Sequence, residues 1–209
     1  MNGFEKQELE TQGMMSRLFG SKPGHNALVE INNFLAESTA ATELTEEIVS
    51  NFIKNWGAKF DSSNIEYRSS MYRKVADYVY ISAVSKDDPV FEETRHLAQV
   101  LELPEKLQRL ADNGAKKVAY FSRCRKIISG EEPLTISEIN NVFGYDYEDG
   151  YDIRVQVFHD YLNKKFDEIA EQQRFSPDEE TALREICTKL DIPYEFKPNI
   201  QNALDKYRY

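Results

Sequence analysis

The sequence predicts an all-α protein in which two tandem, diverged helical repeats follow an N-terminal helical segment. Apolar residues recur every three or four positions, which is the pattern of amphipathic helices. No stretch of useful length alternates apolar and polar residues as a half-buried strand would. Two long segments also share one order of helix-start and helix-stop signals, which is typical of an internal duplication. We therefore expect an N-terminal segment at 1–41, a first repeat at 42–130 and a second repeat at 131–209.

The N-terminal segment is expected to contain one clear helix. In NALVEINNFLAES, Leu28, Ile31 and Leu35 share one helical face. The preceding GSKPGHN has the composition of a turn. Residues 14–20, MMSRLFG, are expected to form a short helix or a loose arm.

The duplication is clearest in one long helix of each repeat. Arg68 aligns with Arg154, 86 positions later. From there one helical stripe holds Tyr72, Ala76, Tyr80 and Ala83 in the first copy and Phe158, Leu162, Phe166 and Ile169 in the second. We therefore expect this stripe to be buried. Tyr78 lies off the stripe and aligns with Lys164, so we expect it to be exposed and available to a partner.

Helix-start signals occur in both copies. Asp88 and Ser176 each precede a proline, which is favoured at the first position of a helix because its missing N–H would be unpaired there. Ser176 with Glu179, and Thr135 with Glu138, fit the capping box, in which side chain and backbone satisfy each other. The helices after the two prolines end alike, at LELP and LDIP.

Composition and charge narrow the classes of protein. The chain has no apolar run of the roughly 20 residues that span a bilayer and no secretory leader pattern. We therefore expect a soluble, cytoplasmic protein that does not bind membranes. Residues 131–209 contain 9 lysines and arginines against 18 aspartates and glutamates, so nucleic acid is disfavoured as a partner. The basic residues within 116–126 are expected to scatter around their helix rather than to form a stripe.

Further local signals concern the cysteines and the last residues. Cys124 and Cys187 lie in helical patterns, and we expect both to be reduced and buried. The last helical pattern runs to Tyr209 without a glycine or proline stop signal. This pattern favours a natural chain that continues beyond residue 209.

Catalytic signatures are missing from the sequence. There is no phosphate-binding glycine loop, no G-x-S-x-G and no H-E-x-x-H, and the three histidines lack partners at metal-ligand spacing. We expect no enzyme activity and no cofactor. The alternative is an enzyme with a cleft between the repeats that uses Arg68 and Arg154. Matched arginines are, however, typical of helix surfaces and of salt bridges between copies.

One acidic stretch, FGYDYEDGYD at 143–152, resembles a calcium loop in composition. An EF-hand needs glycine at position 6 and glutamate at position 12, but with Gly150 at position 6 the twelfth residue is Gln156. Its counterpart in the first copy, WGAKFDSSN, keeps the aromatic residues and the glycine but few acids. We therefore predict a turn anchored by its aromatics, in which the acids are optional. A weak cation site and a partner-binding surface rich in Tyr and Asp are the alternatives.

Residues 83–104, AVSKDDPVFEETRHLAQVLELP, and 170–193, AEQQRFSPDEETALREICTKLDIP, resemble the central helix–loop–helix of tellurite-resistance TerB-like domains. The Asp-Gly turn of that family is replaced here by Asp87-Asp88 in one copy and by Gln173-Arg174 in the other. The resemblance implies an all-α domain that acts by binding, in bacterial stress or phage defence. It also implies a remnant of a metal site at Asp87, Asp88 and Glu92.

These observations favour a non-catalytic protein-interaction or adaptor module, with a metal-binding TerB-like domain and an enzyme as the two alternatives. A protein partner is expected. The candidate partner-binding residues are Tyr78, Tyr145, Asp146, Tyr147, Arg68 and Arg154.

Overall fold

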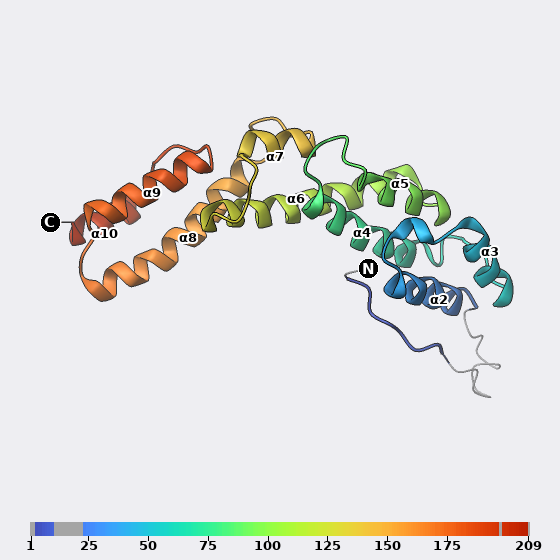
Figure 1. Ribbon diagram of the computed structural model, residues 1–209. Coiled ribbons are helices and arrows are strands. Elements are labelled where there is room, and N and C mark those ends of the chain that lie inside the picture. Colours follow the sequence, from blue (N-terminus) through green and yellow to red (C-terminus); the bar gives the residue numbers. More distant parts are fainter. Residues whose placement is uncertain (1–2, 11–22, 197, 209) are drawn as a thin grey trace. The chain divides into compact units, whose positions relative to one another are not determined.

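Helices account for most of the computed structural model, which describes residues 3–10, 23–196 and 198–208 (Figure 1). The elements are α2 (Pro23–Glu37), the 3-10 helix η1 (Ala41–Glu43), α3 (Glu46–Asn55), α4 (Ile65–Ser82), α5 (Phe91–Val100), α6 (Glu105–Ser129), α7 (Ile136–Phe143), α8 (Tyr151–Gln172), α9 (Pro177–Lys189) and α10 (Pro198–Tyr207). Within the described ranges the only β pairing is one isolated bridge, between Phe175 and Arg208. The predicted all-α class is therefore confirmed. The expectation for residues 14–20 lies outside the described residues.

The chain divides into two compact units. The first comprises the residues up to Ala83 together with Asp87–Lys116, and the second comprises Val84–Lys86 together with the chain from Lys117 onward. The boundary thus lies inside α6, whereas the sequence pattern placed it after residue 130. Glycine and proline signals mark where a helix stops, but they do not show where packing partners change along one continuous helix.

The N-terminal segment is part of the core of the first unit. Leu28, Ile31 and Leu35 are at most 2% exposed, as predicted, and they share one apolar cluster with side chains of α3, α4 and α5. Burial of each such side chain stabilises the fold by roughly 1.5–3 kcal/mol. The extended residues before α2 are held by Asn32, whose Nδ2 donates to the Glu5 carbonyl at 2.8 Å.

The long helices α4 and α8 bury the predicted stripe. Tyr72, Ala76, Tyr80 and Ala83 are buried in the first unit, and Phe158, Leu162 and Ile169 in the second. Phe166 is half-buried and packs against Tyr207, with ring centroids 6.3 Å apart. Tyr78 is 40% exposed, as predicted.

Two predicted capping boxes are confirmed and one predicted cap is wrong. Thr135 with Glu138, and Ser176 with Glu179, make the reciprocal hydrogen bonds of a capping box. Asp88 does not cap α5, because that helix begins at Phe91 after a turn closed by the bond from the Phe91 N–H to the Asp88 carbonyl. The Asp88 carboxylate instead accepts a hydrogen bond from the Val90 N–H at 3.0 Å.

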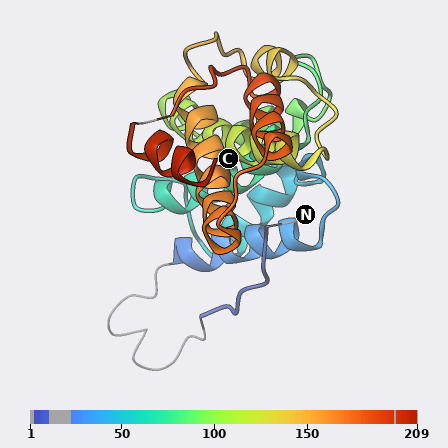
Figure 2. The same ribbon diagram turned by 90° about the vertical axis from the view of Figure 1, so that its left-hand side faces the viewer.

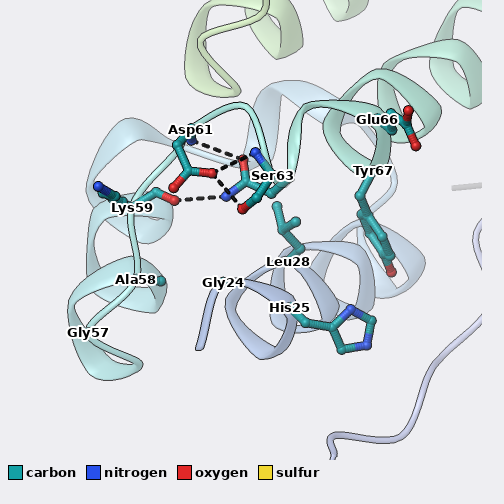
Figure 3. A pocket seen from close by; sticks show the side chains of 11 residues that line it. Gly24, His25, Leu28, Gly57, Ala58, Lys59, Asp61, Ser63, Glu66 and Tyr67 are labelled. Carbon is teal, nitrogen blue, oxygen red and sulfur yellow. Dashed lines mark hydrogen bonds between the residues drawn. The ribbon is translucent and has the colours of Figure 1, made fainter. Parts of the chain in front are cut away.

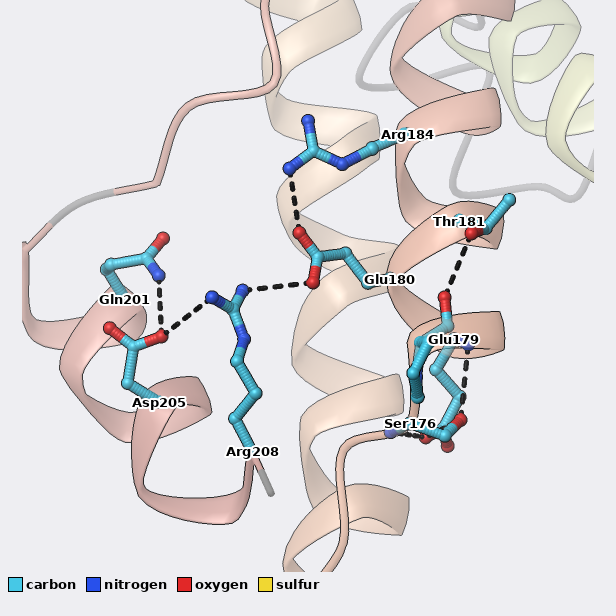
Figure 4. A network of polar contacts seen from close by, with 9 residues as sticks. Ser176, Glu179, Glu180, Thr181, Arg184, Gln201, Asp205 and Arg208 are labelled. Carbon is cyan, nitrogen blue, oxygen red and sulfur yellow. Dashed lines mark hydrogen bonds and ion pairs between the residues drawn. The ribbon is translucent and has the colours of Figure 1, made fainter.

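Helices α9 and α10 pack against α8 in the second unit (Figures 1 and 2). Polar contacts also tie α10 to α9 (Figure 4). Arg208 lies 3.2 Å from Glu180 and 3.3 Å from Asp205, and Glu180 also pairs with Arg184. The Phe175 N–H donates to the Tyr207 carbonyl at 2.9 Å. The start of α9 and the end of α10 are thus joined by both backbone and side-chain contacts.

Candidate functional site

The acidic loop between α7 and α8 in the second unit is held by its own side-chain to backbone hydrogen bonds. Gly144 ends α7 with a φ of 64°, a left-handed conformation that favours glycine. The Asp146 N–H donates to Asp149 Oδ2 at 2.9 Å, and Asp146 Oδ1 accepts from the N–H groups of Glu148 and Asp149 at 3.0 Å. These bonds correct the expectation that the acids are optional, because two of the carboxylates hold the turn.

Arg154 holds the loop from its buried side. Its side chain is fully buried, and it donates from Nη1 to the Tyr120 hydroxyl and from Nη2 to the Tyr147 carbonyl, both at 3.0 Å. Its Cζ lies 4.5 Å from the centroid of the Tyr147 ring. A buried cation needs such compensation, because desolvation of a charge costs several kcal/mol. Arg154 therefore fixes both the backbone and the aromatic ring of the loop.

Tyr120 connects Arg154 to α7. Its hydroxyl donates to Asn140 Oδ1 at 2.8 Å and accepts from Arg154, and burial raises its pKa to about 12. The ring lies so close to Gly150 that a Cβ there would be 2.4 Å from Cζ. No sequence signal pointed to Tyr120 and Asn140, since neither stands in a motif and both are distant from Arg154 along the chain.

Arg68 makes the corresponding contacts in the first unit. It is 3% exposed and donates to the carbonyls of Asp61, Leu101 and Glu102. Like Arg154, it bonds the carbonyl seven residues earlier, and its Cζ lies 4.5 Å from the centroid of a loop aromatic, Phe60. Neither arginine is a surface residue, and within the described residues neither forms an ion pair with a carboxylate. Both are therefore unsuited to direct contact with a partner.

Tyr147 is the part of the acidic loop that faces solvent. Its side chain is 43% exposed, and its hydroxyl donates to the Asp191 carbonyl at 3.2 Å. Tyr145 is half-buried, with its ring centroid 5.5 Å from that of Tyr120, and burial raises its pKa. Asp146 is exposed but holds the turn. Of the loop candidates, Tyr147 is thus the best placed to contact a partner.

A hollow of about 620 Å³ lies in the first unit between the start of α2 and the loop before α4 (Figure 3). The rings of His25 and Tyr67 meet edge to face on one side, 5.9 Å apart. On the other side Asp61 accepts from the Ser63 hydroxyl at 2.6 Å, which together with the Ser63 backbone N–H lowers the pKa of Asp61. Asn64 Nδ2 donates to the Lys59 carbonyl. These polar side chains therefore hold the loop rather than converge on a ligand.

The residues that the family resemblance implied for a metal site are not assembled into one. Asp88 accepts from a backbone N–H, and Glu92 pairs with Arg95 at 2.5 Å. In the ranges that the structure describes, no group of three or more His, Cys, Asp or Glu side chains could hold a metal ion.

The basic residues of α6 do not line up on one face. Arg123 is 3% exposed and its Nη1 lies 3.7 Å from Glu132, whereas the side chain of Arg125 is 58% exposed and pairs with Asp160. The predicted scatter around the helix is therefore seen. The buried position of Arg123 was not anticipated, because Glu132 is nine residues away, beyond the spacing of helical neighbours.

The two cysteines are buried and form no disulfide, as predicted. Burial raises the pKa of Cys124 to about 12 and that of Cys187 to about 11. A thiol exposed by unfolding has a pKa of about 8.5. Because the folded pKa is higher, the thiols stabilise the fold fully below about pH 8.5 and lose this contribution as the pH rises toward the folded values.

We therefore expect both cysteines to resist iodoacetamide at pH 8 in the folded protein and to react within minutes in 6 M guanidinium. Mass spectrometry at timed intervals measures the number of alkylated thiols. The urea concentration at the midpoint of unfolding should also decrease as the pH is raised from 8.5 to 11, because the thiols have higher pKa values in the folded state. Rapid double alkylation under native conditions would contradict this burial.

No family model, curated protein or solved structure matches the chain. Among the described helices, none is long and apolar enough to cross a bilayer. Fold and site thus define an all-α protein with a hydrogen-bonded, acidic loop that exposes a tyrosine. The TerB-like resemblance stays a prediction.

Proposed function

We propose that this chain is a non-catalytic protein-interaction module that binds a partner at the loop 145–149 of the second unit. The observation that carries the proposal is the contrast within this loop. Its backbone is fixed by Asp146, Asp149 and Arg154, while the ring of Tyr147 is 43% exposed on top of it. Tyrosines are enriched among the residues that dominate binding energy at interfaces.

A rigid loop favours binding because little conformational freedom is lost when a partner docks. The cation–π contact with Arg154 already holds the Tyr147 ring, and its hydroxyl is bonded to the Asp191 carbonyl. The ring therefore offers apolar area in one orientation. The exposed acids around it add charge complementarity to a basic surface.

Divergence of the two units supports the same proposal. We infer that both descend from one helical repeat, because Thr45 and Thr135 cap corresponding helices and the loop before each long helix is held by a buried arginine. In the first unit, Asp61 and Asn64 make the turn that Asp146 and Asp149 make in the second. A turn shared by both units explains the fold but not the additional acid of the second loop.

Substitution of Tyr147 by serine is expected to weaken partner binding about 30-fold, as the loss of a central interface tyrosine does. Random peptides displayed on phage are selected on the wild-type chain, and the Kd of the enriched peptides is then measured by fluorescence anisotropy. Tyr78→Ser is the matched control, since Tyr78 is 40% exposed in the other unit. Equal loss in both variants, or no enrichment, would contradict the proposal.

A further inference from the structure

A second hollow, of about 470 Å³, lies in the second unit between the segment that joins α6 to α7 and the C-terminal end of α9. Apolar side chains from Ile127, Pro133, Leu134 and Ile136 form much of its lining. Glu132 and Asp191 contribute carboxylates, and Lys189 contributes an amine. The hollow thus combines apolar walls with an excess of acid.

Glu132 is an unusual residue in this lining, because its carboxylate is buried without a short hydrogen bond within the described residues. The side chain is only 7% exposed. Its contacts within the described residues are the Leu134 N–H, at 3.4 Å from Oε1, and Arg123 Nη1, at 3.7 Å from the same oxygen. Well-formed N–H to oxygen bonds measure about 2.7–3.2 Å, so Glu132 has an ion-pair partner in Arg123 but no short hydrogen bond in the described part of the chain. A buried carboxylate normally has closer donors.

The hollow adjoins the loop that carries Tyr147. Asp191 lines the hollow, and its carbonyl accepts the hydrogen bond from the Tyr147 hydroxyl at 3.2 Å. A partner that covers Tyr147 therefore reaches the edge of the hollow. Asp146, Glu148 and Asp149 lie exposed on the neighbouring loop and extend the negative surface.

We propose that this hollow receives a lysine or arginine side chain from a basic segment of the protein partner, an inference that rests on the proposed function. The aliphatic stem of such a side chain packs against the apolar walls, and its charged head group donates to Glu132 and Asp191. The head group supplies the close donor that Glu132 lacks within the described chain. Charge complementarity identifies the occupant, because residues 131–209 carry twice as many acidic as basic side chains.

Ser137→Lys tests the inference without disturbing the buried Arg123–Glu132 pair. Ser137 is exposed and lines the hollow, so a lysine there supplies a competing cation from within the chain. Ser62→Lys, at an exposed serine of the first unit, is the control with the same charge change. The probes are the phage-displayed random peptides, together with synthetic copies of enriched peptides in which lysine or arginine is replaced by norleucine.

Wild type and Ser62→Lys are expected to enrich peptides with lysine or arginine, and norleucine replacement should weaken them about tenfold. Ser137→Lys should weaken the basic peptides by a similar factor. Asp191→Asn should weaken them about threefold, since asparagine tolerates the left-handed backbone at φ 52° and only the charge is lost.

Enrichment without any preference for basic residues, or full binding by Ser137→Lys, would overturn the inference. If the enriched peptides still lose affinity in Tyr147→Ser, the proposed function stands, and only the lysine or arginine in the hollow is wrong. A further outcome is that millimolar spermidine displaces the peptides while norleucine replacement leaves their affinity unchanged. That result would mark a site for free amines and would also overturn the inference. Failure to enrich any peptide would remove both proposals.

Discussion

Replacement of Arg154 by methionine is expected to lower the free energy of unfolding of the second unit by about 3 kcal/mol. Methionine fills much of the space of the arginine stem but makes neither of the two hydrogen bonds of the guanidinium. The Tyr147 carbonyl loses its donor, and the Tyr120 hydroxyl loses one of its two partners. The loss should be measured by urea unfolding followed by far-UV circular dichroism.

Arg125→Met is the control for the loss of a positive charge from the same unit. Its side chain is 58% exposed and its Nη2 lies 3.5 Å from Asp160, so the change should cost less than about 1 kcal/mol. Similar unfolding midpoints for the two variants would show that the buried guanidinium does not hold the loop. Arg154→Met should also increase hydrogen exchange at the amides of 146–149, which Arg125→Met should not.

Local signals in the sequence predicted much of the fold. The stripes of α4 and α8 and the capping boxes at Thr135 and Ser176 depend on residues within one or two helical turns of each other, so one sequence is enough to find them. Asp88 shows the limit of this reasoning. An aspartate followed by proline fits the start of a helix, yet the residues after Asp88 form a separate turn before α5 begins.

The candidate site could be predicted only in part. The predicted duplication pointed to the loop and its aromatics, but no sequence pattern pointed to the buried residues that support it. Burial of an unpaired charge is costly, so the sequence favours a helix surface or a salt bridge between copies for Arg68 and Arg154. In the structure each arginine bonds the carbonyl seven residues earlier and also a group more than 30 residues away, such as the Leu101 carbonyl or the Tyr120 hydroxyl. Helical periodicity contains no information about such pairs.

The acidic residues of the loop 145–149 differ in what they do: two hold the turn, and one has no structural partner among the described residues. Asp146 and Asp149 replace Asp61 and Asn64 in the same turn, so they need no functional explanation. Glu148 is different, because its carboxylate makes no hydrogen bond or ion pair within the described residues. It is the acid of this loop that the fold does not require, and it stands next to the exposed Tyr147 in the chain. The proposed function uses this additional negative charge beside Tyr147.

Gly150→Ala is expected to destabilise the second unit by about 2–3 kcal/mol, although Gly150 has an ordinary φ of −104°. The added methyl group would lie 2.4 Å from Cζ of Tyr120, a fully buried ring that is bonded to both Asn140 and Arg154 and cannot move without breaking those bonds. Gly114→Ala is the matched comparison, because the atoms nearest its methyl group belong to the far end of the long Arg73 side chain, which is 32% exposed and pairs with Asp77. That substitution should be neutral or stabilise α6 by up to about 1 kcal/mol through helix propensity. Thermal and urea unfolding of both variants measure the difference, and equal stabilities would show that the Tyr120 ring is not held as tightly as its contacts indicate.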